Sequence, residues 1–275
     1  MTPTRRFFRQ CTRYAAGVFS LLTVLATAPA GAHEFWIEPA AFRPAVGREV
    51  PLRLYVGQDF RGESQIYLPQ QFKRYAVFGP DGERAVSATP GDDPAGRFTP
   101  ARPGLHVVVF HGTHAEVSFD TRAEFERYLD KEGLEHVRQL PNYERLVSRR
   151  VIRERYSRSA KSLITVGPAA EPDRVIGLPL ELVAERNPAA GGYSSFPVRL
   201  LLDGRPLPGA LVIAFQRTTP VTRLTVRTDQ DGRALLPLKR PGLWLVSAVH
   251  LAPAPRLARE EWESLWASLT FELAK

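Results

Sequence analysis

The stretch Gly242-Leu243-Trp244-Leu245-Val246-Ser247-Ala248-Val249-His250 has the composition of a long β-strand in a protein interior. A run of this length that contains β-branched and aromatic residues is typical of a buried strand. Turn signals rich in Gly, Pro and Asp separate it from other short segments of strand pattern, for example Gly79-Pro80-Asp81-Gly82. The sequence therefore predicts a mainly β fold.

Two blocks of such strands predict two β-sandwich domains of the Ig-like or prealbumin-like type. The first block covers residues 33–120 and contains an alternating apolar strand at 50–56. The second covers residues 161–275, where strands at 197–202 and 210–215 are joined by a turn rich in Gly and Pro. A chain of 275 residues is long enough for two domains of this size.

Between the two blocks, residues 121–160 predict an α-helical hairpin. Thr121-Arg122-Ala123-Glu124 has the pattern of a capping box, in which a Thr and an acid three residues later accept hydrogen bonds from free backbone amides. We expect a second helix from 142 to 160, with apolar residues among many arginines. The basic run at 149–155 is interpreted as a solvated face of that helix.

Residues 1–32 have the three parts of an export signal, and we predict that they form a signal peptide. Arginines precede a short apolar segment at 15–26, and Ala30-Gly31-Ala32 is a small-x-small cleavage signal. The apolar segment is too short for a membrane span. The protein is therefore expected in the periplasm. Thr4-Arg5-Arg6-Phe7-Phe8-Arg9 resembles a twin-arginine signal, so both that route and the general secretory route stay open.

Charge and cysteine content exclude several kinds of protein. The formal net charge of +8 falls to +4 without residues 1–32, which hold four arginines and no acidic residue. So mild an excess gives no support for a nucleic-acid partner. The one cysteine, Cys11, lies in the predicted signal, so the exported chain has no disulfide and no thiolate metal ligand. Zinc ribbons, iron–sulfur clusters, blue-copper sites and cysteine proteases are thereby excluded.

Several segments together resemble one exported bacterial family. They are Ala32-His33-Glu34-Phe35-Trp36-Ile37-Glu38-Pro39, Val56-Gly57-Gln58-Asp59-Phe60, Arg155-Tyr156-Ser157-Arg158, the stretch 228–238, the stretch 242–250 and the stretch 262–271. The family is DUF4198, a domain of unknown function that was earlier labelled a periplasmic, substrate-specific component of nickel or cobalt uptake. The resemblance covers nearly all of the exported chain. It implies metal handling and a membrane metal transporter as partner, but no settled catalytic residues.

His33 is the first candidate metal ligand. Cleavage after Ala32 would place an α-amine and an imidazole on one residue, and a second imidazole would complete a histidine brace. Nitrogen ligands of this kind suit Cu(II) and Ni(II). The candidates for further ligands are His250, at the end of the buried strand, and His111 and His114, three residues apart in a loop. Each candidate has an alternative interpretation. His33 is then only the residue that cleavage happens to expose, His250 is a core histidine, and residues 111–114 form an exposed turn.

Three functions follow from these residues. The favoured one is binding of a Ni, Co or Cu ion for uptake or delivery, without enzymatic activity. The alternative is a carbohydrate-binding, adhesion or assembly module without metal, which requires exposed aromatic side chains. A copper oxidase of the brace type ranks last. Core packing is the preferred interpretation of the four tryptophans, Trp36, Trp244, Trp262 and Trp266, over a sugar-binding row.

Overall fold

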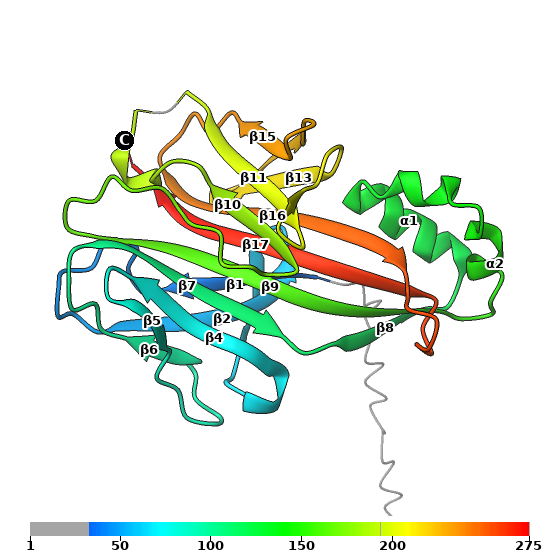
Figure 1. Cartoon of the computed structure of the whole chain (residues 1–275), viewed down its shortest axis with the longest axis horizontal. Coiled ribbons are helices and arrows are strands. Elements are labelled where there is room, and N and C mark those ends of the chain that lie inside the picture. Colours follow the sequence, from blue (N-terminus) through cyan, green and yellow to red (C-terminus); the bar gives the residue numbers. More distant parts are fainter. Residues whose placement is uncertain (1–32, 193, 275) are drawn as a thin grey trace, which may run out of the picture.

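The computed structural model describes residues 33–192 and 194–274, so the predicted signal peptide lies outside the described residues. Within them the protein is mainly β, as the sequence predicts, and its strands form three sheets (Figure 1). A nine-stranded sheet of long strands runs through the middle of the described chain, and two four-stranded sheets pack against it.

The bounds of the elements are as follows. The central sheet has the order β14 (Thr222–Arg227), β13 (Leu211–Gln216), β16 (Gly242–Pro253), β17 (Trp262–Leu273), β9 (Ile152–Val166), β7 (Gly104–Gly112), β4 (Phe72–Gly79) and β5 (Gly82–Ala85), and β8 (Ala115–Phe119) also pairs with β9. One small sheet contains β1 (Glu34–Pro39), β2 (Val50–Gln58), β3 (Arg61–Gln65) and β6 (Gly96–Phe98). The other contains β10 (Leu180–Ala184), β11 (Phe196–Leu202), β12 (Arg205–Pro206) and β15 (Arg233–Leu236). The helical elements are η1 (Pro69–Gln71), α1 (Arg122–Glu132), η2 (Glu135–Gln139), α2 (Tyr143–Val147) and η3 (Pro188–Ala190).

The two predicted sandwich regions share the central sheet. β17 and β9 pair in parallel at its middle, with Leu269 opposite Lys161, whereas its other described pairs are antiparallel. Residue 161, where we expected the second sandwich to begin, therefore lies inside β9. The sheet continues through that position because β9 bonds to the first half of the chain on one side and to its last strand on the other.

The two small sheets cover opposite faces of the central sheet. On β9, Ala160 and Ile164 pack against β1 and β2, while Leu163 packs against β10 and β11. Successive side chains of a strand point to opposite faces, so this alternation separates the two cores. Further along the face that carries β1, the helices α1 and α2 cover the ends of β16 and β17 (Figure 1).

The predicted helical hairpin is only partly present. The capping box forms, since Glu124 N donates to Thr121 Oγ1 over 3.2 Å and Thr121 N donates to the Glu124 carboxylate over 3.3 Å. The second helix was predicted too long, because α2 ends at Val147 and residues 152–166 form β9. The charged run hid a strand alternation in which Glu154, rather than an apolar residue, points inward.

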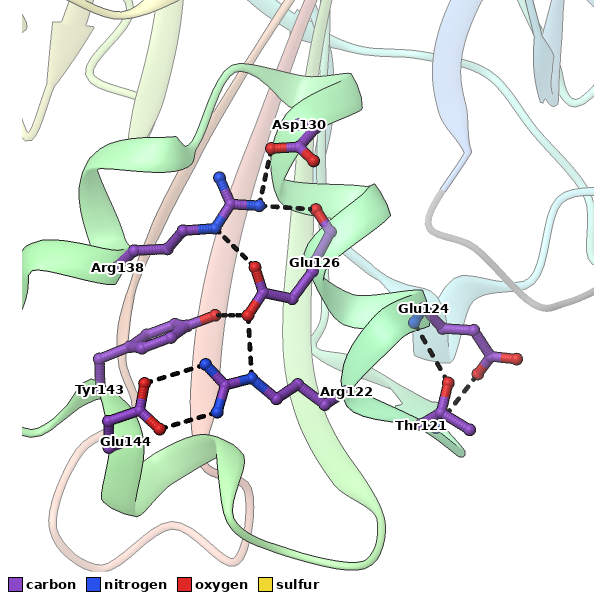
Figure 2. Close-up of polar contacts among 8 residues, drawn as sticks. All are labelled: Thr121, Arg122, Glu124, Glu126, Asp130, Arg138, Tyr143 and Glu144. Atoms are coloured by element: carbon purple, nitrogen blue, oxygen red, sulfur yellow. Dashed lines mark hydrogen bonds and ion pairs between the residues drawn. The ribbon is translucent and has the colours of Figure 1, made fainter.

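A network of charged side chains joins the helices to each other (Figure 2). The carboxylate of Glu126 on α1 accepts hydrogen bonds from Arg122, Arg138 and Tyr143. Arg122 also donates two hydrogen bonds to Glu144 on α2, at 2.7 and 2.9 Å. An isolated ion pair on a protein surface contributes about 0–1 kcal/mol to stability. Here several donors share the Glu126 carboxylate, and together they fix the orientation of α2 against α1.

All four tryptophans are core residues, as preferred from the sequence. The exposed fractions of Trp36, Trp244, Trp262 and Trp266 are 1, 2, 0 and 4%. Trp262 and Trp266 form the floor on which α1 packs, and Trp36 packs on β13 and β16. In the described part of the chain, none of the helices has the length and apolarity that crossing a membrane requires.

Candidate functional site

The structure does not bring His33 and His250 together. Arg158 on β9 donates a hydrogen bond from Nη2 to the carbonyl oxygen of His33 over 3.2 Å. His250 lies in register with Leu265, which lies in register with Ser157, the residue before Arg158. Residues in register share a face and sequence neighbours alternate, so His250 and Arg158 point to opposite faces of the sheet. The backbone of His33 therefore lies on one face of the central sheet, whereas the His250 side chain points to the opposite face.

His250 instead has a histidine neighbour, His136, that is not among the ligands predicted from the sequence. A cavity of about 570 Å³ at the edge of β16 is lined by His250 and by His136 of η2. Burial lowers the pKa of His250, and the neighbouring His136 lowers it further. His136 itself is exposed. No sequence signal links the two histidines, because they meet only when η2 covers the edge of the sheet.

His111 and His114 lie close to each other among cations. The Nε2 atom of His114 donates to Glu263 over 3.1 Å, while Nδ1 accepts from Arg155 over 3.0 Å, so both ring nitrogens are engaged. Burial lowers the pKa of His111, and Lys73 and His114 lower it further. The positive side chains around His111 and His114 disfavour the binding of a metal cation there. Among the described residues, no three His, Asp or Glu side chains are grouped to hold a metal ion.

Three buried glutamates lie where the β1 sheet meets the helices. Glu34 begins β1, Glu132 ends α1 and Glu154 belongs to β9, and their exposed fractions are 3, 4 and 0%. The Oε2 atoms of Glu34 and Glu154 are buried and have no hydrogen-bond partner. A buried polar atom without a hydrogen-bond partner is unusual in a folded protein, because the atom has lost its contacts with water without replacing them.

Burial controls the protonation of these carboxyl groups. It raises the pKa of Glu154 to about 8, partly opposed by hydrogen bonds from Ser264 and Tyr128. It raises the pKa of Glu132 to about 7, where Lys131 opposes the shift and Glu34 adds to it. The pKa of Glu34 is also raised by burial, with Lys131 again opposing the shift.

The neighbours of Glu154 form a fixed chain of hydrogen bonds. Trp266 Nε1 donates to Ser264 Oγ over 2.9 Å, Ser264 donates to Glu154 Oε1, and Tyr128 donates to the same oxygen over 3.3 Å. Glu132, by contrast, has Lys131 Nζ 3.4 Å from its Oε1. Glu154 lies in the run at 149–155, which was interpreted as a solvated helix face, and no sequence signal marks Glu132 as buried.

A second buried charged group occupies the other face of β9. Lys161 is 1% exposed, and its Nζ lies 2.7 Å from Asp173 and 3.0 Å from Glu181. Its third contact is the carbonyl oxygen of Arg174, at 2.9 Å. Glu181 also accepts hydrogen bonds from three backbone amides, those of Ile176, Gly177 and Leu178. The charged groups of this cluster therefore pair with one another and with backbone groups, and they hold the loop before β10 against the sheet.

The fold places the chain among mainly β proteins whose sheets pack face to face. Residues 30–252 match the family model described as "Domain of unknown function (DUF4198)", and the chain belongs to that family, as its motifs indicated. A comparison with curated proteins gives no match.

Two solved structures are similar in part. The "D0-D1 domain of Intimin" is 12% identical, covers 86% of this chain and 97% of its own, and has a TM-score of 0.21. The "tetra-tandem repeat in extending region of large adhesion protein" is 10% identical, covers 88% of this chain and 50% of its own, and has a TM-score of 0.22. Scores this low transfer neither a function nor a site.

Proposed function

We propose that this DUF4198 protein is a periplasmic carrier that binds a Ni, Co or Cu ion at the start of β1 and delivers it to a membrane transporter. The observation that carries the proposal is Glu34 Oε2, which is buried without a hydrogen-bond partner in electrostatic reach of the buried Glu132. An unpaired buried carboxylate is destabilising, and a bound cation removes that cost. His33 precedes Glu34 directly and offers the nitrogen ligand that these metals prefer.

Cleavage after Ala32 would add the second nitrogen. His33 would then contribute its α-amine and its imidazole. Glu34 and Glu132, which are not grouped with it as ligands in the described structure, would have to draw together around the ion to contribute oxygens and compensate its charge. Lys131 is the competing cation, since its Nζ is already 3.4 Å from Glu132. An ion binds here only if it replaces that weak contact with direct ligand bonds.

The site would lose metal as the pH falls. Ligands must be deprotonated to bind a metal, so protons compete with the ion. Because the pKa of Glu132 is about 7, the affinity should rise as the pH is raised through that value. The imidazole of His33 adds to the dependence in the same direction.

The test is titration calorimetry with Ni(II), Co(II) and Cu(II) on the protein that begins at His33. Glu34→Gln and Glu132→Gln are each expected to weaken the tightest-bound ion at least about tenfold, because each removes one carboxylate ligand. Lys131→Met should strengthen binding, since it removes the competing cation. Glu83→Gln changes an exposed acid on β5 and is the matched control, for which we expect no change.

A second protein with one extra residue before His33 tests the amine. The addition moves the α-amine away from the imidazole, so a loss of Cu(II) and Ni(II) affinity supports the amino-terminal ligand. The proposal fails if the affinity stays unchanged in the extended protein and in both glutamate variants, because the ion then binds elsewhere.

The adhesion or carbohydrate-binding alternative has little support from the surface. The exposed large apolar residues of the described chain are not aromatic and comprise Val46, Ile66, Val175, Leu235 and Leu257. A stacking row for sugars therefore cannot be built from the tryptophans, which are all in the core.

A further inference from the structure

A separate pocket opens beside the β1 sheet, where the strand pairs β7–β9 and β8–β9 part. Its volume is about 260 Å³. Its walls are largely apolar and come from both sheets, with Phe35, Leu54, Phe72 and Phe110 among them. The loop between β7 and β8, which includes Thr113, forms one rim, and the exposed Ile66 lies at another.

Arg158 is the cationic side chain with free donors in this pocket. Its guanidinium lies over the rings of Tyr156 and Phe35, with 4.8 and 5.9 Å from Cζ to the ring centroids. One donor is used by the carbonyl oxygen of His33, the Tyr156 side chain is a second hydrogen-bond partner, and Nε is buried without one. Burial lowers the pKa of Arg158, and Tyr156 and the more distant Glu34 oppose that shift.

No described carboxylate forms an ion pair with Arg158, whereas its neighbour Arg155, on the other face of β9, pairs with Glu263 at 3.1 Å. None of the residues that line the pocket is acidic, and the remaining polar ones are Gln65, Gln71, Thr113 and His114. A guanidinium that is desolvated against aromatic rings and lacks a carboxylate is incomplete, because two of its donors fit the two oxygens of one carboxylate.

We propose that this pocket binds a small organic carboxylate with an apolar body, whose two oxygens face Arg158 and whose body packs on Phe35, Phe72 and Phe110. The volume of about 260 Å³ is slightly below that of common small-molecule sites, which measure about 300–1,000 Å³, so a single ring or a short branched chain fits best. The amides of Gln65 and Gln71 and the Thr113 hydroxyl supply polar contacts at the rim. This site requires no metal and does not depend on the carrier function proposed above.

The test uses metal-free protein titrated with benzoate, followed by calorimetry and by NMR of the bound ligand. Benzamide has the same shape without the charge and is expected to bind at least about tenfold more weakly. Arg158→Gln should weaken benzoate binding to the level of benzamide, and Arg158→Lys should restore only part of the affinity because an ammonium lacks the planar fork. Arg153→Gln, on the same strand but exposed, is the matched control and should bind as the parent does.

Val56→Phe provides a variant that leaves Arg158 in place. It fills the apolar part of the pocket and should abolish benzoate binding while the thermal unfolding midpoint stays close to that of the parent. The proposal is overturned if benzoate does not bind the parent protein, if benzamide binds equally well, or if Val56→Phe binds benzoate with unchanged affinity. Loss of Ni(II) binding in these variants plays no part in the result, so the two proposals fail independently.

Discussion

β9 carries a buried charged residue on each face, and the two have opposite surroundings. Lys161 contacts two carboxylates and a backbone carbonyl, so each hydrogen of its ammonium has a partner. Glu154, on the other face, accepts two hydrogen bonds on Oε1 and none on Oε2, and no cation among the described residues forms an ion pair with it. The difference teaches that burial alone does not define a site. Complete pairing makes a charged residue part of the structure, whereas incomplete pairing leaves it open to a proton or a ligand.

The largest expected effect comes from breaking the complete cluster. Lys161→Met leaves Asp173 and Glu181 buried without their cation, and removal of one partner of such a pair costs about 3–5 kcal/mol. Urea unfolding followed by circular dichroism measures the loss. Lys239→Met removes an exposed lysine and should change the free energy of unfolding by less than about 0.5 kcal/mol. Equal losses in the two variants would show that the cluster contributes nothing specific.

The incomplete cluster should appear in the pH dependence of stability. Burial raises the pKa of Glu154 in the folded state to about 8, against 4.5 for a glutamate in water, so between these values the folded state holds a proton that the unfolded state has lost. The free energy of unfolding therefore falls as the pH rises through this interval, by about 1.4 kcal/mol per unit for one such group.

Glu154→Gln should remove that part of the slope, because the amide does not titrate. Unfolding of the parent and the variant at pH 5 and pH 8 measures it. A variant whose stability declines with pH as steeply as that of the parent would contradict a protonated Glu154. Lys161→Met is not expected to reduce this slope, since it acts on the opposite face.

The smallest effect should come from the helix network of Figure 2, which is charged but mostly solvated. Glu126→Gln weakens contacts with Arg122 and Arg138 and should cost about 1 kcal/mol or less. High salt screens such pairs, so the difference from the parent should shrink at about 1 M NaCl, whereas the cost of Lys161→Met should persist. A salt-insensitive loss in Glu126→Gln would mean that Glu126 behaves like the buried cluster.

The sequence predicted local features of the fold well and its long-range pairing poorly. The strands near 50–56, 210–215 and 242–250 follow from apolar patterns, and the capping box at Thr121 follows from the side chains that form it. The parallel pairing of β17 with β9 left no local signal, because it joins segments that are far apart in the chain. The strand at 152–160 was mistaken for a helix because its inward positions include Glu154 and Arg158 rather than apolar residues.

The same contrast between local and long-range features applies to the candidate site. His33 was found because it follows a cleavage pattern, and Glu34 is the next residue in the chain. Glu132 and Glu154 were not found, because burial of a charged residue depends on which elements pack over it. The histidine partners also depended on the tertiary structure, since His250 meets His136 and His114 meets Glu263 and Arg155.

The position of β17 has a consequence for when the protein can fold during its synthesis. This strand lies between β16 and β9, yet it follows every other described strand in the chain. The ribosome must therefore make residues 262–273 before β9 and β16 can be joined, so the central sheet stays in two parts until its last described strand has been translated. Until then β9 exposes an open strand edge on the side that β17 later occupies, and a chaperone would meet this edge first.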